Sequence, residues 1–215
     1  VIREILSDAK KRGLPCRITG MTDGDRAFLE EKFPDTFHFH TVRDSFDYVY
    51  DIHRLAELKG KKLQGKRNHC NRFAAQYPDY EVIPICLENL PLCEAFAEEW
   101  YRSHVHTGED FEGEKRALTR AFAWFTELRM EGILLKTADG IMGFSMGNRI
   151  REDTFDVNFE KALPEVNGAY PTVNREFARR IREAHPTVQY LNREDDMGLE
   201  GLRRAKESYY PDILL

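Results

Sequence analysis

The order of helix-like and strand-like segments across residues 80–209 constrains the fold more than any other feature of the sequence. A strand at 80–86 leads to two helices with apolar stripes at helical spacing, and three strands follow between residues 133 and 162. A helix from Pro171, a strand at 188–192 and a last helix complete the pattern. Strands mixed with helices in this way predict an α/β (α+β) fold in which helices flank a mixed central sheet.

The first part of the chain resembles the closing portion of the same pattern. The predicted elements are helices at 1–11 and 23–33 and strands at 15–21, 37–42 and 46–50. Because residues 1–11 already read as a helix, we expect the chain to begin inside a domain. We also expect the early strands to belong to a second, similar sheet.

The composition is that of an ordinary folded protein, with 41% apolar and 32% charged residues among 215. The formal charge of −5 means that any contact with nucleic acid or anionic lipid requires a local basic patch. The cysteines, Cys16, Cys70, Cys86 and Cys93, have no CxxC spacing, which favours buried reduced thiols over a zinc or redox motif. No apolar run approaches the roughly 20 residues that span a bilayer, so we expect a cytoplasmic protein without an integral membrane segment.

The required basic patch lies between residues 59 and 73, where six basic residues occur with no acidic residue among them. They are Lys59, Lys61, Lys62, Lys66, Arg67 and Arg72. A run of this kind commonly forms a solvated helix face, and the alternative is contact with phosphates.

Two polar clusters could carry chemistry. In the strand TFDVNFEKA, alternation places Asp156, Asn158 and Glu160 on one face and three apolar residues on the other. The polar face is either the solvent side or a catalytic surface. The run NREDDMG follows the next strand, where Asp195 or Asp196 could cap the last helix, and Arg193 and Glu194 could line a pocket.

Other candidates have simpler alternatives. Tyr170 could protonate a leaving group or pack against a helix start, and the basic residues Arg203, Arg204 and Lys206 could form a solvated face. Histidines occur in two pairs, His38 with His40 and His104 with His106, but neither pair has a carboxylate or cysteine at a metal-ligand spacing. We therefore predict no metal site.

Three strings carry a resemblance to a known family. They are KGKKLQGKRNHCNRF at 59–73, VNFEKA at 157–162 and YLNREDDMGLEGLRRAKESYYP at 190–211. They resemble the DUF2156 family, which is grouped with the soluble C-terminal domain of phosphatidylglycerol lysyltransferases. The element order is similar to that of the GNAT acyltransferase fold, and the whole chain resembles the tandem GNAT arrangement of Fem aminoacyltransferases.

The resemblance implies a domain organisation and a set of roles. Residues 1–52 would be the end of an incomplete first GNAT-like domain, 53–79 a basic helical connector and 80–215 a second GNAT-like domain. Glu160 would be the general base, with Glu194 and Tyr170 as further catalytic groups. Substrate would be bound by Asp156, Asn158, Asn192, Arg193 and Lys206. Phosphates of tRNA would be contacted by Lys61, Lys62, Lys66, Arg67 and Arg72.

The donor distinguishes three functional hypotheses. Acyl-CoA enzymes of this fold use a glycine-rich loop to hold pyrophosphate, but the equivalent stretch here, LPEVNGAYPTVN, has one glycine and no arginine. The first hypothesis is therefore aminoacyl transfer from aminoacyl-tRNA to a small amine or hydroxyl acceptor, without a cofactor. The alternatives are a CoA-dependent N-acyltransferase and a non-catalytic module that binds RNA or a metabolite.

Overall fold

The computed structural model describes residues 1–103 and 109–215, which form two compact units. The first unit, residues 1–45, contains α1 (Ile2–Arg12), α2 (Asp23–Lys32) and the 3₁₀ turn η1 (Arg43–Ser45). Thr22 and Asp25 form a capping box at the start of α2.

Two strands predicted in the first unit are absent from its described residues. Neither 15–21 nor 37–42 pairs with another segment. Phe37 instead contacts Phe33 and Phe39, with ring centroids 6.1 and 6.2 Å apart. The two strand predictions are wrong because a strand requires a hydrogen-bonded partner, which alternation in one segment cannot guarantee.

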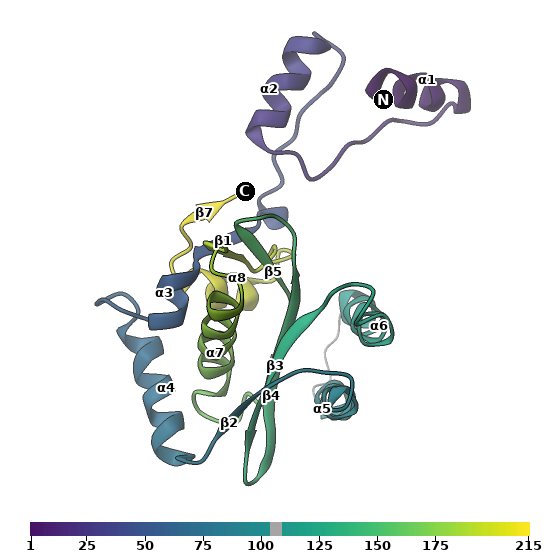
Figure 1. The fold of residues 1–215 in the computed structure, drawn as a ribbon. Helices are drawn as coiled ribbons and strands as arrows, with labels where there is room; N and C mark the ends of the chain where they lie inside the picture. Colours follow the sequence, from purple (N-terminus) through teal and green to yellow (C-terminus); the bar gives the residue numbers. More distant parts are fainter. Residues whose placement is uncertain (104–108) are drawn as a thin grey trace. The chain divides into compact units, whose positions relative to one another are not determined.

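The second unit, residues 46–215, is a helix-flanked sheet (Figure 1). Its strands are β1 (Tyr48–Asp51), β2 (Glu81–Pro84), β3 (Glu131–Thr137), β4 (Gly140–Arg149), β5 (Thr154–Ala162), β6 (Tyr190–Asn192) and β7 (Ile213–Leu214). Its helices are α3 (Ile52–Glu57), α4 (Gln64–Gln76), α5 (Leu90–Ser103), α6 (Glu109–Ala123), α7 (Ala169–Ala184) and α8 (Glu200–Glu207). These elements confirm the predicted mixed α/β fold class.

Within the described residues, the strands form one sheet in the order β2-β3-β4-β5-β6-β1-β7. The β5–β6 pair is parallel and the other neighbours are antiparallel. Strand β1 was expected in a separate sheet, but it pairs with β6, so that assignment is wrong. The break between compact units falls after Ser45 and differs from the predicted boundary at residue 52. That residues 1–52 are the C-terminal part of a first GNAT-like domain stays a prediction.

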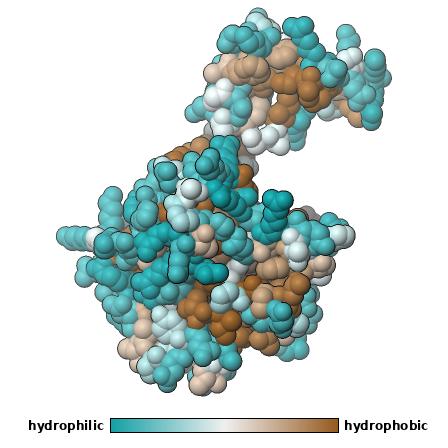
Figure 2. Space-filling view, in the orientation of Figure 1, coloured by the Kyte–Doolittle hydropathy of each residue, from teal (hydrophilic) through white to brown (hydrophobic). Residues whose placement is uncertain are grey.

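Helices cover both faces of the sheet. Helices α3, α4 and α7 lie on one side, and α5 and α6 lie on the other (Figure 1). On the α7 side, Phe155 packs against Phe177 at 5.8 Å between ring centroids, and on the other side Trp100 and Phe144 are buried. The face of the second unit seen in Figure 2 is mostly hydrophilic, with separate hydrophobic areas. No helix in the described ranges is both long and apolar enough to cross a membrane.

A bulge in β5 changes which face its side chains occupy. Met146 pairs with Phe159 and Asn148 pairs with Asp156, so two steps along β4 match three steps along β5. Gly147 lies opposite the extra residue, where a Cβ would be 1.8 Å from the carbonyl oxygen of Asp156. Strict alternation along β5 was therefore a wrong prediction. Phe155 packs on the α7 side, whereas Phe159 joins the cluster under α5 and α6.

Candidate functional site

The candidate site lies where β5 and β6 separate. The two strands pair only as far as Asp156 and Asn192. Strand β5 then continues to Ala162, while the chain after β6 stays with β1, because Arg193 N–H donates to the carbonyl oxygen of Tyr48. The parallel pair therefore opens beyond Asp156, and polar side chains from both strands meet around the opening.

Glu160 and Arg193 form an ion pair in this opening. Arg193 Nη2 lies 2.8 Å from Glu160 Oε1, and the two side chains are only 12% and 11% exposed. Asn174 of α7 donates from Nδ2 to the other carboxylate oxygen at 3.0 Å. The guanidinium also lies over the rings of Tyr209 and Tyr50, at 5.0 and 5.7 Å from the centroids. Both carboxylate oxygens of Glu160 therefore accept a hydrogen bond.

A second polar group contains a pair of carboxylates, Asp156 of β5 and Glu194 of the loop after β6. Asn158 Nδ2 donates to Asp156 Oδ2 at 2.9 Å and to Glu194 Oε1 at 3.1 Å, so one amide bridges both acids. Burial, reinforced by the negative charges of Glu194 and Asp47, raises the pKa of Asp156 from 3.8 to about 7. Burial also raises the pKa of Glu194. The pair can hold a proton near neutral pH.

The backbone around Glu194 is held in an unusual conformation. Its φ is +55°, a left-handed value that is uncommon for residues other than glycine. Asn192 supports it by accepting from Glu194 N–H at 2.9 Å while donating to Asp47 at 2.8 Å. Lys206 Nζ donates to the carbonyl oxygens of Arg193 (2.5 Å), Glu194 (3.1 Å) and Asp195. Lys206 therefore fixes the loop, and burial lowers its pKa to about 8.

Neither Asp195 nor Asp196 caps α8, whose N-cap residue is Leu199, so that prediction is wrong. Asp196 instead accepts hydrogen bonds from Tyr48 Oη at 2.6 Å and from Arg203 at 2.8 Å. The ion pair between Asp196 and Arg203 joins the loop to α8.

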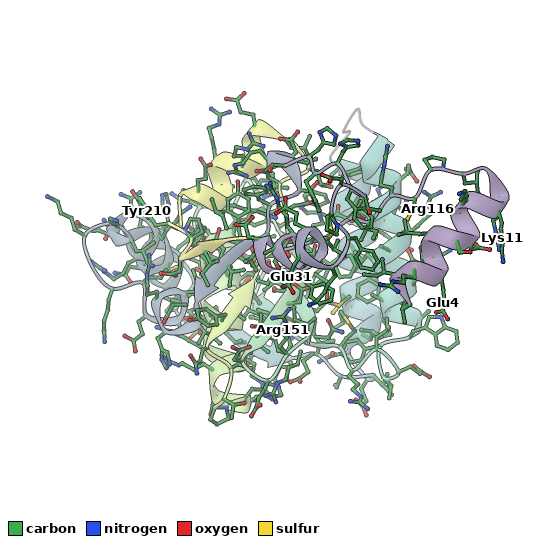
Figure 3. The ribbon with its side chains drawn as sticks, turned by 90° about the horizontal axis from the view of Figure 1, so that it is seen from above. Glu4, Lys11, Glu31, Arg116, Arg151 and Tyr210 are labelled. Carbon is green, nitrogen blue, oxygen red and sulfur yellow. The ribbon has the colours of Figure 1, made fainter. Side chains whose placement is uncertain are left out.

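The basic residues of the connector take different positions. Lys66 is half-buried, with Nζ 4.1 Å from the centroid of the Tyr209 ring, whereas Lys62 lies over the ring of Tyr210 at 5.3 Å. Tyr210 is exposed and is labelled in Figure 3. Arg67 donates to the carbonyl oxygen of Leu58 at 2.6 Å. Lys61 and Arg72 are exposed. Only part of this segment is therefore a free basic surface, and Lys66 belongs to the site.

The remaining predicted groups have the following placements. Burial raises the pKa of Tyr170, on the first turn of α7, to about 12, so this phenol keeps its proton at neutral pH. Cys70 and Cys93 are buried as expected, but Cys86 is exposed and Cys16 partly exposed. Among the described residues, no three His, Cys, Asp or Glu side chains group as metal ligands would. His104 and His106 lie outside the described residues.

The structure places the predicted residues in two groups where β5 and β6 separate: Glu160 pairs with Arg193, and Asp156 and Asn158 join Glu194. Sequence reasoning missed four further members of the site: Asp47, Tyr50, Asn174 and Tyr209. Asp47 and Tyr50 lie far before the two strings, Asn174 lies between them on α7, and Tyr209 directly follows α8. Only the pairing of β1 with β6 and the packing of α7 and α8 bring these residues to the site. Their roles, like those of the predicted residues, are proposals.

Across residues 1–103 and 109–215, a seven-stranded mixed sheet opens between two parallel strands and has helices on both faces, which places the protein in the GNAT-like class of α/β folds. The family model described as phosphatidylglycerol lysyltransferase, C-terminal, matches residues 1–215, and the chain belongs to this family.

Several known proteins are similar to this chain in sequence or in fold. A conserved protein of unknown function from Bacteroides thetaiotaomicron is 40% identical, with a TM-score of 0.94 over 100% of this chain and 72% of that one. L-PGS from Bacillus licheniformis shares the fold at 17% identity, with a TM-score of 0.68 over 99% of this chain and 69% of that one. An uncharacterized protein of Mycoplasmoides gallisepticum is 28% identical over 80% of this chain, which spans 54% of that relative's length.

Proposed function

We propose that this chain transfers an aminoacyl group from an aminoacyl-tRNA to an amine or hydroxyl acceptor. The observation that carries the proposal is the amide-bridged carboxylate pair, Asp156 and Glu194, at the point where β5 and β6 separate. A general base is most effective when its pKa is close to the working pH, and this pair meets that condition.

In the proposed reaction, the pair accepts a proton from the acceptor as its nitrogen or oxygen attacks the ester carbonyl carbon of the donor. The new acyl bond forms as the bond to the ribose oxygen of the tRNA breaks, and that oxygen receives a proton. Tyr170, which keeps its proton at neutral pH, stays our candidate for the proton donor. Glu160, which the sequence suggested as the base, is assigned to holding Arg193, because both of its oxygens already accept hydrogen bonds.

The packing of α4 supports a donor other than CoA. Gly168 precedes α7 in the loop that would hold a CoA pyrophosphate, and a Cβ there would lie 2.3 Å from the carbonyl oxygen of His69 in α4. His69 Nδ1 is also within 2.9 Å of Asn167 Oδ1. Helix α4 therefore lies directly against this loop, where backbone N–H groups would have to face phosphates.

The exposed basic side chains support an RNA donor. Lys61, Lys62 and Arg72 are exposed in and around α4 of a chain whose net charge is −5. The family description names a lysyl group and phosphatidylglycerol, so lysyl-tRNA and vesicles containing phosphatidylglycerol are the first donor and acceptor to test.

The test is single-turnover transfer from radiolabelled lysyl-tRNA, comparing wild type with Asp156→Asn. Asp79→Asn is the matched control, because it removes the same charge from an exposed position. Loss of a general base should slow transfer by roughly 10²- to 10⁴-fold. Equal transfer rates for wild type and Asp156→Asn would remove the carboxylate pair from the mechanism.

A further inference from the structure

Lys66 is a half-buried cation without an acidic partner. Its ammonium group lies over the Tyr209 ring, and no carboxylate of the described residues is within ion-pair distance. Burial lowers the pKa of Lys66, and the positive charge of Arg193 lowers it further. Charged groups removed from water are normally paired, so an unpaired ammonium beside a second cation requires an explanation.

The neighbouring charges do not balance Lys66. Glu160 is the carboxylate that stabilises both cations, but its two oxygens already accept from Arg193 and Asn174. Arg193 also has a nitrogen, Nη1, that is buried and makes no hydrogen bond to the described residues. The two cations Lys66 and Arg193 therefore face the single carboxylate of Glu160. The part of the opening around these three residues has an excess of positive charge.

We propose that Lys66 and Arg193 form a phosphate-binding subsite next to Glu160, and that this subsite holds a phosphate group of one of the two substrates. The proposal rests on the proposed function and specifies what its substrates must carry. A guanidinium offers directed N–H donors and an ammonium offers a compact charge, and both bind phosphate oxygens well. The rings of Tyr50 and Tyr209 would form the walls of the subsite.

The phosphate could come from the RNA donor or from the acceptor. Lys61 and Lys62 are exposed just before α4, so a polyanion on that surface could extend a phosphate towards Lys66. A phosphorylated acceptor would instead enter with its own phosphate. The chemistry of the subsite is the same in both cases, and a competition measurement separates them.

The test is calorimetric binding of inorganic phosphate at constant ionic strength to wild type, Lys66→Gln, Lys66→Arg and Lys136→Gln. Lys136 is the matched control, because the same substitution removes an exposed positive charge from β3, away from the proposed subsite. We expect Lys66→Gln to weaken binding roughly tenfold, as for loss of one charge-assisted hydrogen bond. Lys66→Arg and Lys136→Gln should bind about as well as wild type, and the arginine variant also shows that a loss is not due to misfolding.

Failure of wild type to bind phosphate, or equal affinities in all four proteins, would overturn the proposal. An RNA hairpin with a free 3′ CCA end is then added. Competition with phosphate would assign the subsite to the donor, and simultaneous binding would assign it to the acceptor. Since these measurements involve no transfer, a chain that binds phosphate through Lys66 but transfers nothing would contradict only the proposed function.

Discussion

Replacing Asp156 by Asn should stabilise the protein at neutral pH while it impairs transfer. Burial and two neighbouring acids raise the pKa of Asp156 from 3.8 to about 7, so the ionised carboxylate is unfavourable in the folded protein. Each pKa unit corresponds to about 1.4 kcal/mol, which gives an upper limit of about 4 kcal/mol. Partial exposure and the shared proton with Glu194 reduce our expectation to roughly 1–2 kcal/mol.

The effect must depend on pH in a defined direction. A carboxyl group whose pKa is higher in the folded state favours folding at low pH and loses that contribution as pH rises through its folded pKa of about 7. Below the unfolded pKa, near 3.8, the group is protonated in both states and titration contributes nothing to the difference. The stability of Asp156→Asn relative to wild type should therefore increase between about pH 4 and pH 8.

The measurement is urea denaturation of wild type, Asp156→Asn and Asp79→Asn at several pH values across this range. Asp79 is exposed, so its variant should differ from wild type by less than about 0.5 kcal/mol throughout. If Asp156→Asn is less stable than wild type by the same amount at every pH, the carboxylate pair is not strained and the reasoning fails. A variant that is more stable but inactive would be typical of a functional residue.

Two further substitutions test the packing of the site. Glu160→Gln should lower the free energy of unfolding by about 2–3 kcal/mol, because it leaves the mostly buried Arg193 without its counter-charge. The exposed control Glu165→Gln should change this free energy little. Equal urea midpoints for wild type and Glu160→Gln would argue against the ion pair. Gly168→Ala should cost more than Gly60→Ala, although φ is +87° at the first and +89° at the second. Backbone strain of about 1 kcal/mol applies to both, but only at Gly168 does the added methyl group meet a carbonyl oxygen of α4, which adds roughly 1–3 kcal/mol. If Gly168→Ala and Gly60→Ala lower the melting temperature equally, α4 does not press on the loop that contains Gly168.

The predictability of the fold followed the strength of local patterns. Strand β5 was predicted at its observed residues, and α7 began within two residues of the predicted start, because apolar periodicity and turn residues were strong there. The strand at 46–50 is present as β1, but the strands predicted at 15–21 and 37–42 are absent, because strand formation depends on pairing with segments far away in the sequence. Strand β1 has its partner about 140 residues later in the chain, and no local pattern encodes that contact.

The site was predictable in its residue types but not in its connections. Both polar strings were identified, yet alternation gave the wrong face for Phe159 because a bulge adds one residue to β5. Gly147 was the available signal, since a glycine inside a strand often marks a bulge on the neighbouring strand. Lys66 was assigned to an outer RNA surface, because its side chain could not be placed before the packing of α4 against Tyr209 was known.

The most direct test of the central claim offers both donors to the same protein. Lysyl-tRNA carrying a ¹⁴C-lysyl group and ³H-acetyl-CoA are mixed with the chain, phosphatidylglycerol vesicles and a set of soluble amines, and the product fraction is counted for both isotopes. Our account predicts that ¹⁴C enters the product, that ³H does not, and that Asp156→Asn prevents the transfer. Transfer of ³H without ¹⁴C would contradict it and identify a CoA-dependent acyltransferase.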